Sequence, residues 1–185
     1  MLKHGKAQLA IKWLLRAQAK DKRNALVYYN LGLAHEQVKR YTRAISCYRR
    51  AVLHDPTLLD AAVCLGYLYG VRGDQKRELG CYEEVLRRDP RHAVALYNKA
   101  VTLHDDLENP KAAIQWYHAV LQVPLTRQQQ NDVYWRLVYA YLDTQQYGKA
   151  DKSLHTLIRR IKAYPKNRSS GDIYGNRRSV KRKRG

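Results

Sequence analysis

Residues 28–56 read YYNLGLAHEQVKRYTRAISCYRRAVLHDP, and residues 62–90, which begin 34 positions later, read AVCLGYLYGVRGDQKRELGCYEEVLRRDP. Leu, Gly, Tyr and Pro recur in both stretches at the same spacing, and the dipeptide Asp-Pro closes each of them. A further step of 34 reaches Leu96 and Ala100, and one extra residue near Asn109 precedes the rest of this third copy. An internal period of this length indicates a repeat architecture, in which one supersecondary unit is stacked several times.

The spacing inside one copy predicts a pair of helices. Tyr28, Leu31 and Gly32 lie three and four positions apart, on one face of a first helix. Ala44 and Tyr48, four positions apart, lie on one face of a second helix. The small Gly and Ala residues let the two helices approach, Tyr fills the space beside them, and Pro ends the second helix. The residues expected in the core are Leu31, Tyr48, Leu65 and Tyr82.

One such helix pair is too small to bury its apolar face alone, so the copies are expected to stack into one continuous core. The sequence therefore predicts an all-α fold of about four helix pairs, preceded by one unpaired helix. The expected helices span residues 6–20, 25–38, 41–54, 59–71, 75–88, 93–105, 110–122, 131–145 and 147–162.

This pattern resembles the tetratricopeptide repeat (TPR). The resemblance covers about residues 8–162 and rests on the recurrence of Leu, Gly, Tyr, Ala and Pro at a spacing of 34. The third and fourth copies depart from it because they lack the Gly, and the fourth lacks the Pro at its usual place. The resemblance implies a right-handed superhelix, or α-solenoid, that serves as a non-enzymatic adaptor or scaffold for partner proteins.

Charge and composition divide the chain into three segments. Residues 1–24 carry seven basic residues and one acid, and they contain a half-repeat helix. Residues 25–162 form the repeat array, with copies that start near 25, 59, 93 and 131. Residues 163–185 form a basic tail rich in Gly, Ser and Asn, a composition that cannot bury a core and predicts flexibility.

The first helix of each pair is expected to line a concave groove, as the resemblance implies. By helical geometry the groove side carries apolar and aromatic residues, which suit a peptide or helix ligand because rings give large contact area at low entropic cost. The alternative is a tight superhelix in which these side chains cover one another. The predicted groove residues are Tyr29, Asn30, Leu33, Val63, Tyr67, Tyr97, Asn98, Val101, Trp135, Arg136 and Tyr139.

Two subclasses of the family bear on the ligand. One clamps the C-terminal carboxylates of chaperones with five Lys, Asn and Arg residues. Here only Asn98 and Arg136 match these places, and Asp132 has the wrong sign, so the clamp is not expected. The apolar groove is more similar to that of small secretion-type chaperones, which stay the lesser alternative because the basic termini argue against a simple match.

The basic tail leaves several partners open. It suits the phosphates of RNA, and an RNA- or ribonucleoprotein-associated subunit is therefore the alternative function. It also suits an acidic protein, an anionic lipid, or an import receptor that recognises a nuclear localisation signal. A solvated tail without a partner is the remaining alternative. The basic residues are Lys166, Arg168, Arg177, Arg178, Lys181, Arg182, Lys183 and Arg184.

The N-terminal helix matches the second helix of a copy, with no first helix before it. Ala10, Leu14 and Ala17 carry this match. The face that a first helix would cover is predicted to meet another protein or a second copy of the chain. This face lies near Leu9, Trp13 and Leu15.

No set of residues predicts catalysis, so we expect no enzyme activity, cofactor, metal or small-molecule substrate. Cys47, Cys64 and Cys81 are 17 positions apart, whereas a zinc knuckle needs close cysteine pairs. A phosphate-binding glycine loop is absent from the sequence. The unpaired cysteines indicate a reducing, intracellular compartment, with the cytoplasm first and the nucleus or an organelle open.

Overall fold

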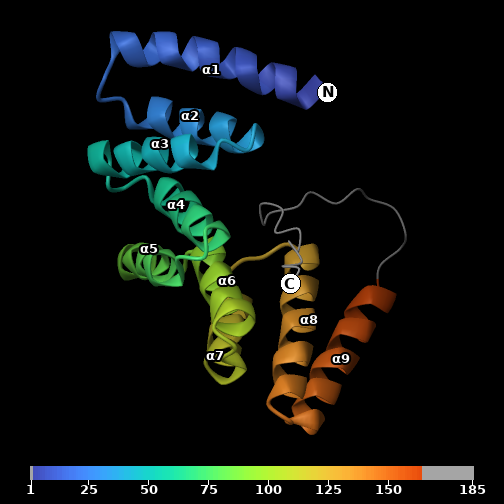
Figure 1. The fold of residues 1–185 in the computed structure, drawn as a ribbon. Coiled ribbons are helices and arrows are strands. Elements are labelled where there is room, and N and C mark those ends of the chain that lie inside the picture. The colour runs from blue at the N-terminus through green and yellow to red at the C-terminus, as the bar shows by residue number, and fades with distance from the viewer. Residues whose placement is uncertain (1, 164–185) are drawn as a thin grey trace, which may run out of the picture. The chain divides into compact units, whose positions relative to one another are not determined.

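The computed structural model describes residues 2–163, and side chains from residue 5 onward. Within this range every regular element is helical (Figure 1). The elements are α1 (Leu2–Lys20), α2 (Ala25–Gln37), α3 (Tyr41–His54), α4 (Leu59–Val71), α5 (Gln75–Arg88), α6 (Ala93–Val101), the π-helical turn η1 (Thr102–Asp106), α7 (Pro110–Leu121), α8 (Arg127–Asp143) and α9 (Tyr147–Lys162). The predicted order of one helix followed by helix pairs is confirmed.

Side chains at the helix starts set several of these boundaries. The side chain of Asn109 accepts a hydrogen bond from the Ala112 N–H, and Pro110 occupies the first position of α7. Thr126 and Gln129 form a capping box, in which each side chain bonds the other's backbone N–H. This cap starts α8 at Arg127, four residues before the predicted start at 131.

The extra residue of the third copy lies in η1 rather than near Asn109, where the sequence placed it. The turn within each helix pair contains one residue with a positive φ: Lys39, Gly73, Glu108 and Gln145. Gly73 follows Lys39 by 34 positions, but Glu108 follows Gly73 by 35. The N–H of Leu107 donates to the carbonyl of Thr102, a π-type bond that accommodates one more residue per turn. The predicted helix over 93–105 therefore ends in a π turn.

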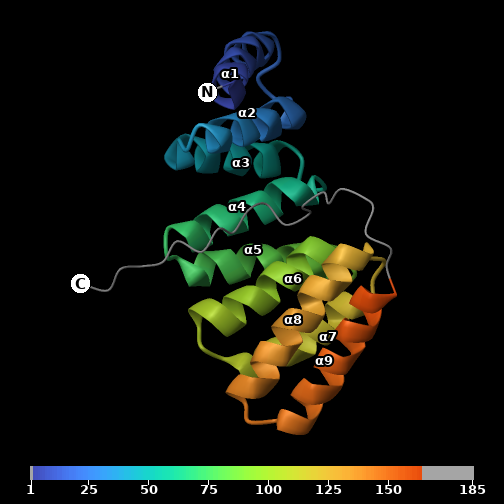
Figure 2. The ribbon, with the colours of Figure 1, turned by 90° about the vertical axis from the view of Figure 1, so that its right-hand side faces the viewer.

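The chain divides into two compact units, which are described separately. The N-terminal unit runs to Asn98 and the C-terminal unit begins at Lys99. In the N-terminal unit, α1 packs on α2, α2 on α3, α3 on α4 and α4 on α5 (Figure 2). In the C-terminal unit, α7 packs on η1 and α8, and α8 packs on α9. Both units thus consist of stacked antiparallel helices.

One contact closes the helix pairs of the N-terminal unit. Tyr48 is fully buried, and a Cβ added at Gly32 would overlap its ring. The second pair repeats the arrangement, since a Cβ at Gly66 would lie 2.8 Å from the ring of Tyr82. Glycine therefore provides the space for the tyrosine ring in both pairs. The predicted core residues are all buried: Leu31, Tyr48, Leu65 and Tyr82.

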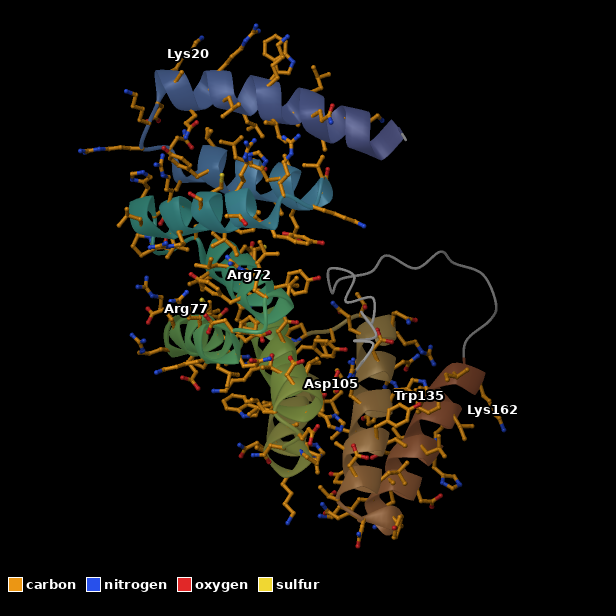
Figure 3. All side chains as sticks on the ribbon, viewed as in Figure 1. Lys20, Arg72, Arg77, Asp105, Trp135 and Lys162 are labelled. Atoms are coloured by element: carbon orange, nitrogen blue, oxygen red, sulfur yellow. The ribbon has the colours of Figure 1, made fainter. Side chains whose placement is uncertain are left out.

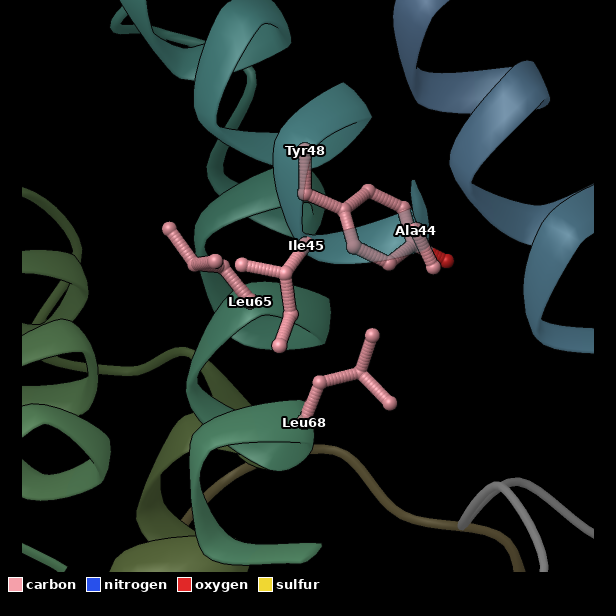
Figure 4. Close-up of a cluster of buried hydrophobic side chains, with 5 residues drawn as sticks. All are labelled: Ala44, Ile45, Tyr48, Leu65 and Leu68. Atoms are coloured by element: carbon pink, nitrogen blue, oxygen red, sulfur yellow. The ribbon is translucent and has the colours of Figure 1, made fainter. Parts of the chain in front are cut away.

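The helix pairs then pack on one another through aliphatic residues. Ile45 on α3 lies among Leu65 and Leu68 of α4, beside Ala44 and Tyr48 (Figure 4). Burying each of these large apolar side chains contributes roughly 1.5–3 kcal/mol. This cluster joins one copy to the next, as stacking requires.

Glu78 of the second copy replaces a small repeat residue of the first copy, and the structure accommodates the larger side chain by a change nearby. It stands where the first copy has Ala44, yet it is fully buried. The hydroxyl of Tyr82 donates to its Oε1 at 3.1 Å, and a Cβ at Gly70 would overlap its carboxylate. Gly70 is therefore needed to make room for the larger side chain.

Candidate functional site

A stripe of exposed apolar residues runs along α8, and we call Trp135, Tyr139 and Leu142 the α8 stripe. These residues are four and three positions apart and have exposed fractions of 43%, 56% and 43%. The rings of Trp135 and Tyr139 are stacked, with centroids 6.1 Å apart and an interplanar angle of 25°. Figure 3 labels Trp135 on α8. Their spacing places all three residues on one side of the helix.

The opposite side of α8 holds this stripe in place. Val133, Leu137 and Ala140 are buried, and α8 packs on both α7 and α9. The stripe therefore lies on a helix whose position is set by its core side. Because two stacked rings hold each other's orientation, the stripe also loses little side-chain freedom when a ligand binds.

Arg136 lies beside the stripe and is held by the π turn. Its guanidinium donates to both carboxylate oxygens of Asp105, at 2.9 and 2.6 Å. Asp105 belongs to η1, so the extra residue of the third copy helps to place this ion pair. The apolar stripe thus has a charged border that can hydrogen-bond a ligand backbone.

His104, also in η1, links three elements of the C-terminal unit. Its Nε2 lies 2.8 Å from Oδ2 of Asp143 at the end of α8, and its Nδ1 lies 3.4 Å from the hydroxyl of Tyr117 on α7. The His104 side chain is buried. Both ring nitrogens contact protein groups, which favours a structural role in anchoring the π turn.

Four of the predicted groove residues are buried and belong to the packed interior instead. Val63 packs with Tyr82 and Ala95 in the core of the N-terminal unit. The other three are Tyr97, Asn98 and Val101. The angle around a helix places these residues on the groove side, but it does not predict how closely neighbouring elements approach.

The remaining groove residues of the N-terminal unit are mostly half-buried. Tyr29, Leu33 and Tyr67 pack against the cluster around Tyr48, and burial raises the pKa of Tyr29 to about 12. Asn30 is exposed, and its side-chain amide donates to the Leu26 carbonyl within α2. In the N-terminal unit the structure therefore favours the alternative to an open groove, in which the groove-side side chains cover one another. The predicted aromatic surface remains open only at Trp135 and Tyr139.

The described residues offer little reactive chemistry. In the range 2–163, no group of three or more His, Cys, Asp or Glu side chains could hold a metal ion. Burial raises the pKa of Cys64 to about 12 and that of Cys81 to about 11, so these thiols stay protonated near neutral pH. No helix of this range is both long and apolar enough to cross a membrane. The predicted tail residues, Lys166 to Arg184, lie outside the described residues.

Family models identify the repeat. Two models, both described as tetratricopeptide repeat, match residues 25–58 and 79–133. The chain belongs to the tetratricopeptide repeat family. As in other TPR proteins, its repeats form a protein-interaction scaffold.

Two curated relatives of this TPR chain are longer than the part they share with it. Photosystem I assembly protein Ycf3 from Acaryochloris marina is 28% identical over 96 residues, which are 50% of this chain and 58% of the relative. Tetratricopeptide repeat protein 37 from Xenopus laevis is 27% identical over 178 residues, 91% of this chain and 11% of the relative. The TPR chain thus spans less than two thirds of the length of either relative.

Solved structures of MamA have the same fold. One MamA crystal structure superposes with a TM-score of 0.77 at 17% identity, covering 85% of this chain and 90% of MamA. A MamA RS-1 double mutant also gives 0.77 at 16% identity, covering 90% and 91%. At this identity the likeness shows the fold alone, and it confirms the predicted all-α TPR solenoid.

Proposed function

We propose that this TPR chain is a non-enzymatic adaptor that holds an apolar polypeptide segment of a partner against the α8 stripe. The observation that carries the proposal is the stacked, exposed pair of Trp135 and Tyr139, continued by Leu142. Aromatic anchors on a rigid element are typical of interaction hot spots. A scaffold role is also consistent with the name of the Acaryochloris relative, an assembly protein.

The stripe suits a ligand with two or three apolar anchors. Trp135 and Leu142 are seven residues apart, which is roughly 10 Å along a helix at about 1.5 Å per residue. This length accommodates two turns of an amphipathic helix or about three residues of an extended strand. Arg136 and Asp105 at the border supply a donor and an acceptor for the ligand's polar groups. The partner segment therefore carries apolar residues at helical or alternating spacing, next to polar ones.

A binding assay with selected peptides tests this proposal. Peptides are selected from a random displayed library for binding to the wild-type chain, and their affinities are then measured on Trp135→Ala/Tyr139→Ala. We expect most of them to lose about 2 kcal/mol or more, roughly thirtyfold in Kd. Tyr147→Ala is the matched control, because Tyr147 is an exposed aromatic on the neighbouring helix α9. Peptides that bind the double variant with unchanged affinity would exclude the α8 stripe as the site.

The basic tail supports a second candidate, an RNA-associated role. Residues 164–185 carry eight basic residues and one acid. If the tail contacts phosphates of single-stranded RNA, log affinity should fall with log salt by about 0.7 per contact. Deletion of residues 165–185 should flatten this slope while peptide binding to the α8 stripe is kept. Equal RNA binding by the full and shortened chains would assign the tail to an acidic protein, a lipid or an import receptor.

We also propose a reducing compartment as the place of action. Cys47, Cys64 and Cys81 are free thiols, each half-buried. Burial raises the pKa of all three, which slows their oxidation because the thiolate is the reactive form.

A further inference from the structure

The helix α1 differs from the other second helices in how its equivalent residues are covered. The repeat spacing gives three positions of α1 an equivalent in each of α3, α5 and α7: Ala10, Leu14 and Ala17. In α1 these three residues are only half-buried. In the other three helices all nine equivalent residues are fully buried: Ala44, Tyr48, Ala51, Glu78, Tyr82, Val85, Ala113, Tyr117 and Val120.

In α3 and α5, a helix provides this cover. The first helix of the same pair packs against each of them, α2 on α3 and α4 on α5. Ala10 and Leu14 pack in part against the cluster of Ile11, Leu31 and Ala34 between α1 and α2. No first helix covers the rest of this side of α1 among residues 2–163. Two larger apolar residues extend this uncovered side, Leu9 and Trp13, with exposed fractions of 57% and 58%. We call Leu9, Ala10, Trp13, Leu14 and Ala17 the α1 face.

Basic residues surround the α1 face, and no acid balances them within the helix. The sequence of α1 contains no Asp or Glu. Lys6, Lys12 and Arg16 are exposed, and the guanidinium carbon of Arg16 lies 4.7 Å from the centre of the Trp13 ring. At 100° per residue, Lys12 and Arg16 border the face on one side, while Lys6 and Lys20 lie toward its two ends. Figure 3 shows Lys20 at the C-terminal end of α1.

We propose that the α1 face binds an amphipathic helix of a partner protein whose apolar stripe is flanked by acidic residues. In the other second helices of the array, the equivalent side packs against a helix. The apolar residues of the α1 face would contact the apolar stripe of the partner helix. The cations around the face then pair with Asp or Glu, which raises the association rate and selects against basic helices. A second copy of α1 is disfavoured as occupant because it would bring a second set of cations against the first.

The proposal is tested on the full chain with two synthetic helical peptides. Both carry the same Leu stripe, one flanked by Glu and the other by Lys. We expect the Glu-flanked peptide to bind at least tenfold more tightly than the Lys-flanked one, with an affinity that falls as salt rises. Trp13→Ala should weaken its binding about tenfold or more. Helical circular dichroism should be unchanged in this variant, because Trp13 is exposed.

A matched pair of charge reversals locates the site. Lys12→Glu/Arg16→Glu should weaken binding of the Glu-flanked peptide at least tenfold. Arg43→Glu/Arg49→Glu changes the net charge equally on exposed positions of α3 and should alter the affinity less than twofold. Trp135→Ala/Tyr139→Ala should also leave this binding unchanged. The test of the α1 face is thereby separate from that of the α8 stripe.

Several outcomes would overturn the proposal. Equal affinity for the two peptides, or equal loss in the two charge-reversed variants, would show that the α1 face does not recognise an acidic helix. A dimer in sedimentation equilibrium that Leu9→Glu abolishes would make a second copy the occupant. Binding of oligouridine or phosphatidylserine vesicles that is lost in Lys12→Glu/Arg16→Glu but kept in Arg43→Glu/Arg49→Glu would assign the face to nucleic acid or lipid.

Discussion

The two units of the molecule bury the same repeat tyrosine in different surroundings. In the N-terminal unit, Tyr48 and Tyr82 lie against glycines, and their hydroxyls donate to Glu36 and Glu78. In the C-terminal unit, Tyr117 is equally buried, but its hydroxyl meets a ring nitrogen of His104. Ala100 replaces the glycine there and is itself fully buried. The repeat tyrosine is thus fully buried in both units, while the residues around its ring differ.

A second position shows the same kind of exchange. The first two copies have Leu31 and Leu65, whereas the third has Lys99, which is buried as well. The Lys99 ammonium lies 4.2 Å from the centre of the Trp116 ring, and the first two copies have cysteine where Trp116 stands. A large aromatic residue therefore compensates for a buried cation through a cation–π contact.

This comparison also indicates why the candidate site lies in the less regular unit. Regular copies half-bury their groove-side residues against the apolar cluster that joins two neighbouring copies, as Tyr29 and Tyr67 do. The C-terminal unit, with its π turn, leaves Trp135 and Tyr139 exposed and sets an ion pair beside them. Irregularity in a repeat protein thus marks the surface where ligand chemistry is most expected.

The largest expected effect is the loss of a repeat tyrosine. Tyr48→Ala and Tyr117→Ala should each lower the free energy of unfolding by about 3–5 kcal/mol, because each leaves a cavity of ring size. Guanidinium unfolding followed by circular dichroism measures the loss. Tyr48→Phe is the control, since it removes only the hydrogen bond to Glu36 and should cost about 1 kcal/mol. A loss below 1 kcal/mol for either alanine variant would contradict the packing described for that unit.

The next effect distinguishes glycines that make room from glycines that do not. Gly32→Ala should destabilise the chain by about 1–3 kcal/mol, because the new Cβ overlaps the Tyr48 ring. Gly80→Ala in α5 has open space around its Cβ and should stabilise by about 0.5–1 kcal/mol through helix propensity. The same unfolding measurement tests both. A stabilising Gly32→Ala would show that the close approach of ring and helix is not required.

A smaller effect concerns the buried cation of the third copy. A double-mutant cycle with Lys99→Met and Trp116→Leu should give a coupling of roughly 0.5–2 kcal/mol, the range of a cation–π contact away from water. The same cycle on Arg16 and Trp13, whose contact is exposed, should give less. A coupling near zero at Lys99 and Trp116 would mean that the cation–π contact does not contribute to stability.

The smallest effect is a pH dependence expected in the N-terminal unit. Burial lowers the pKa of His35 below its usual range, and Arg43 and Arg40 lower it further. The unfolded chain therefore takes up a proton before the folded chain does, and stability falls as the pH drops below about 6.5. His35→Phe should flatten this decline in pH-dependent melting, whereas His155→Gln at an exposed site should not. If the stability of His35→Phe falls at low pH as much as that of the wild type, other titratable groups cause the decline.

The repeat period predicted most of the fold because it reports which residues must be buried together. Leu31, Tyr48 and their counterparts were identified as core from spacing alone, and all are buried. The helix pairs followed from the same spacing. The start of α8 was missed because its signal is a capping box, Thr126 with Gln129, and not an apolar pattern. The position of the π turn was missed because an inserted residue can be absorbed at any of several turns.

By itself, the sequence determined the repeat, its helix pairs, the family and the residues that close each pair. These features depend on local periodicity and on side-chain size, which follow directly from the amino-acid sequence. Only the tertiary structure decided that Val63, Tyr97 and Val101 are interior, that Lys99 is buried under Trp116, and that Trp135 and Tyr139 remain exposed. Exposure depends on how closely other helices approach a given face, and helical periodicity specifies the direction of a side chain but not the distance to its neighbours.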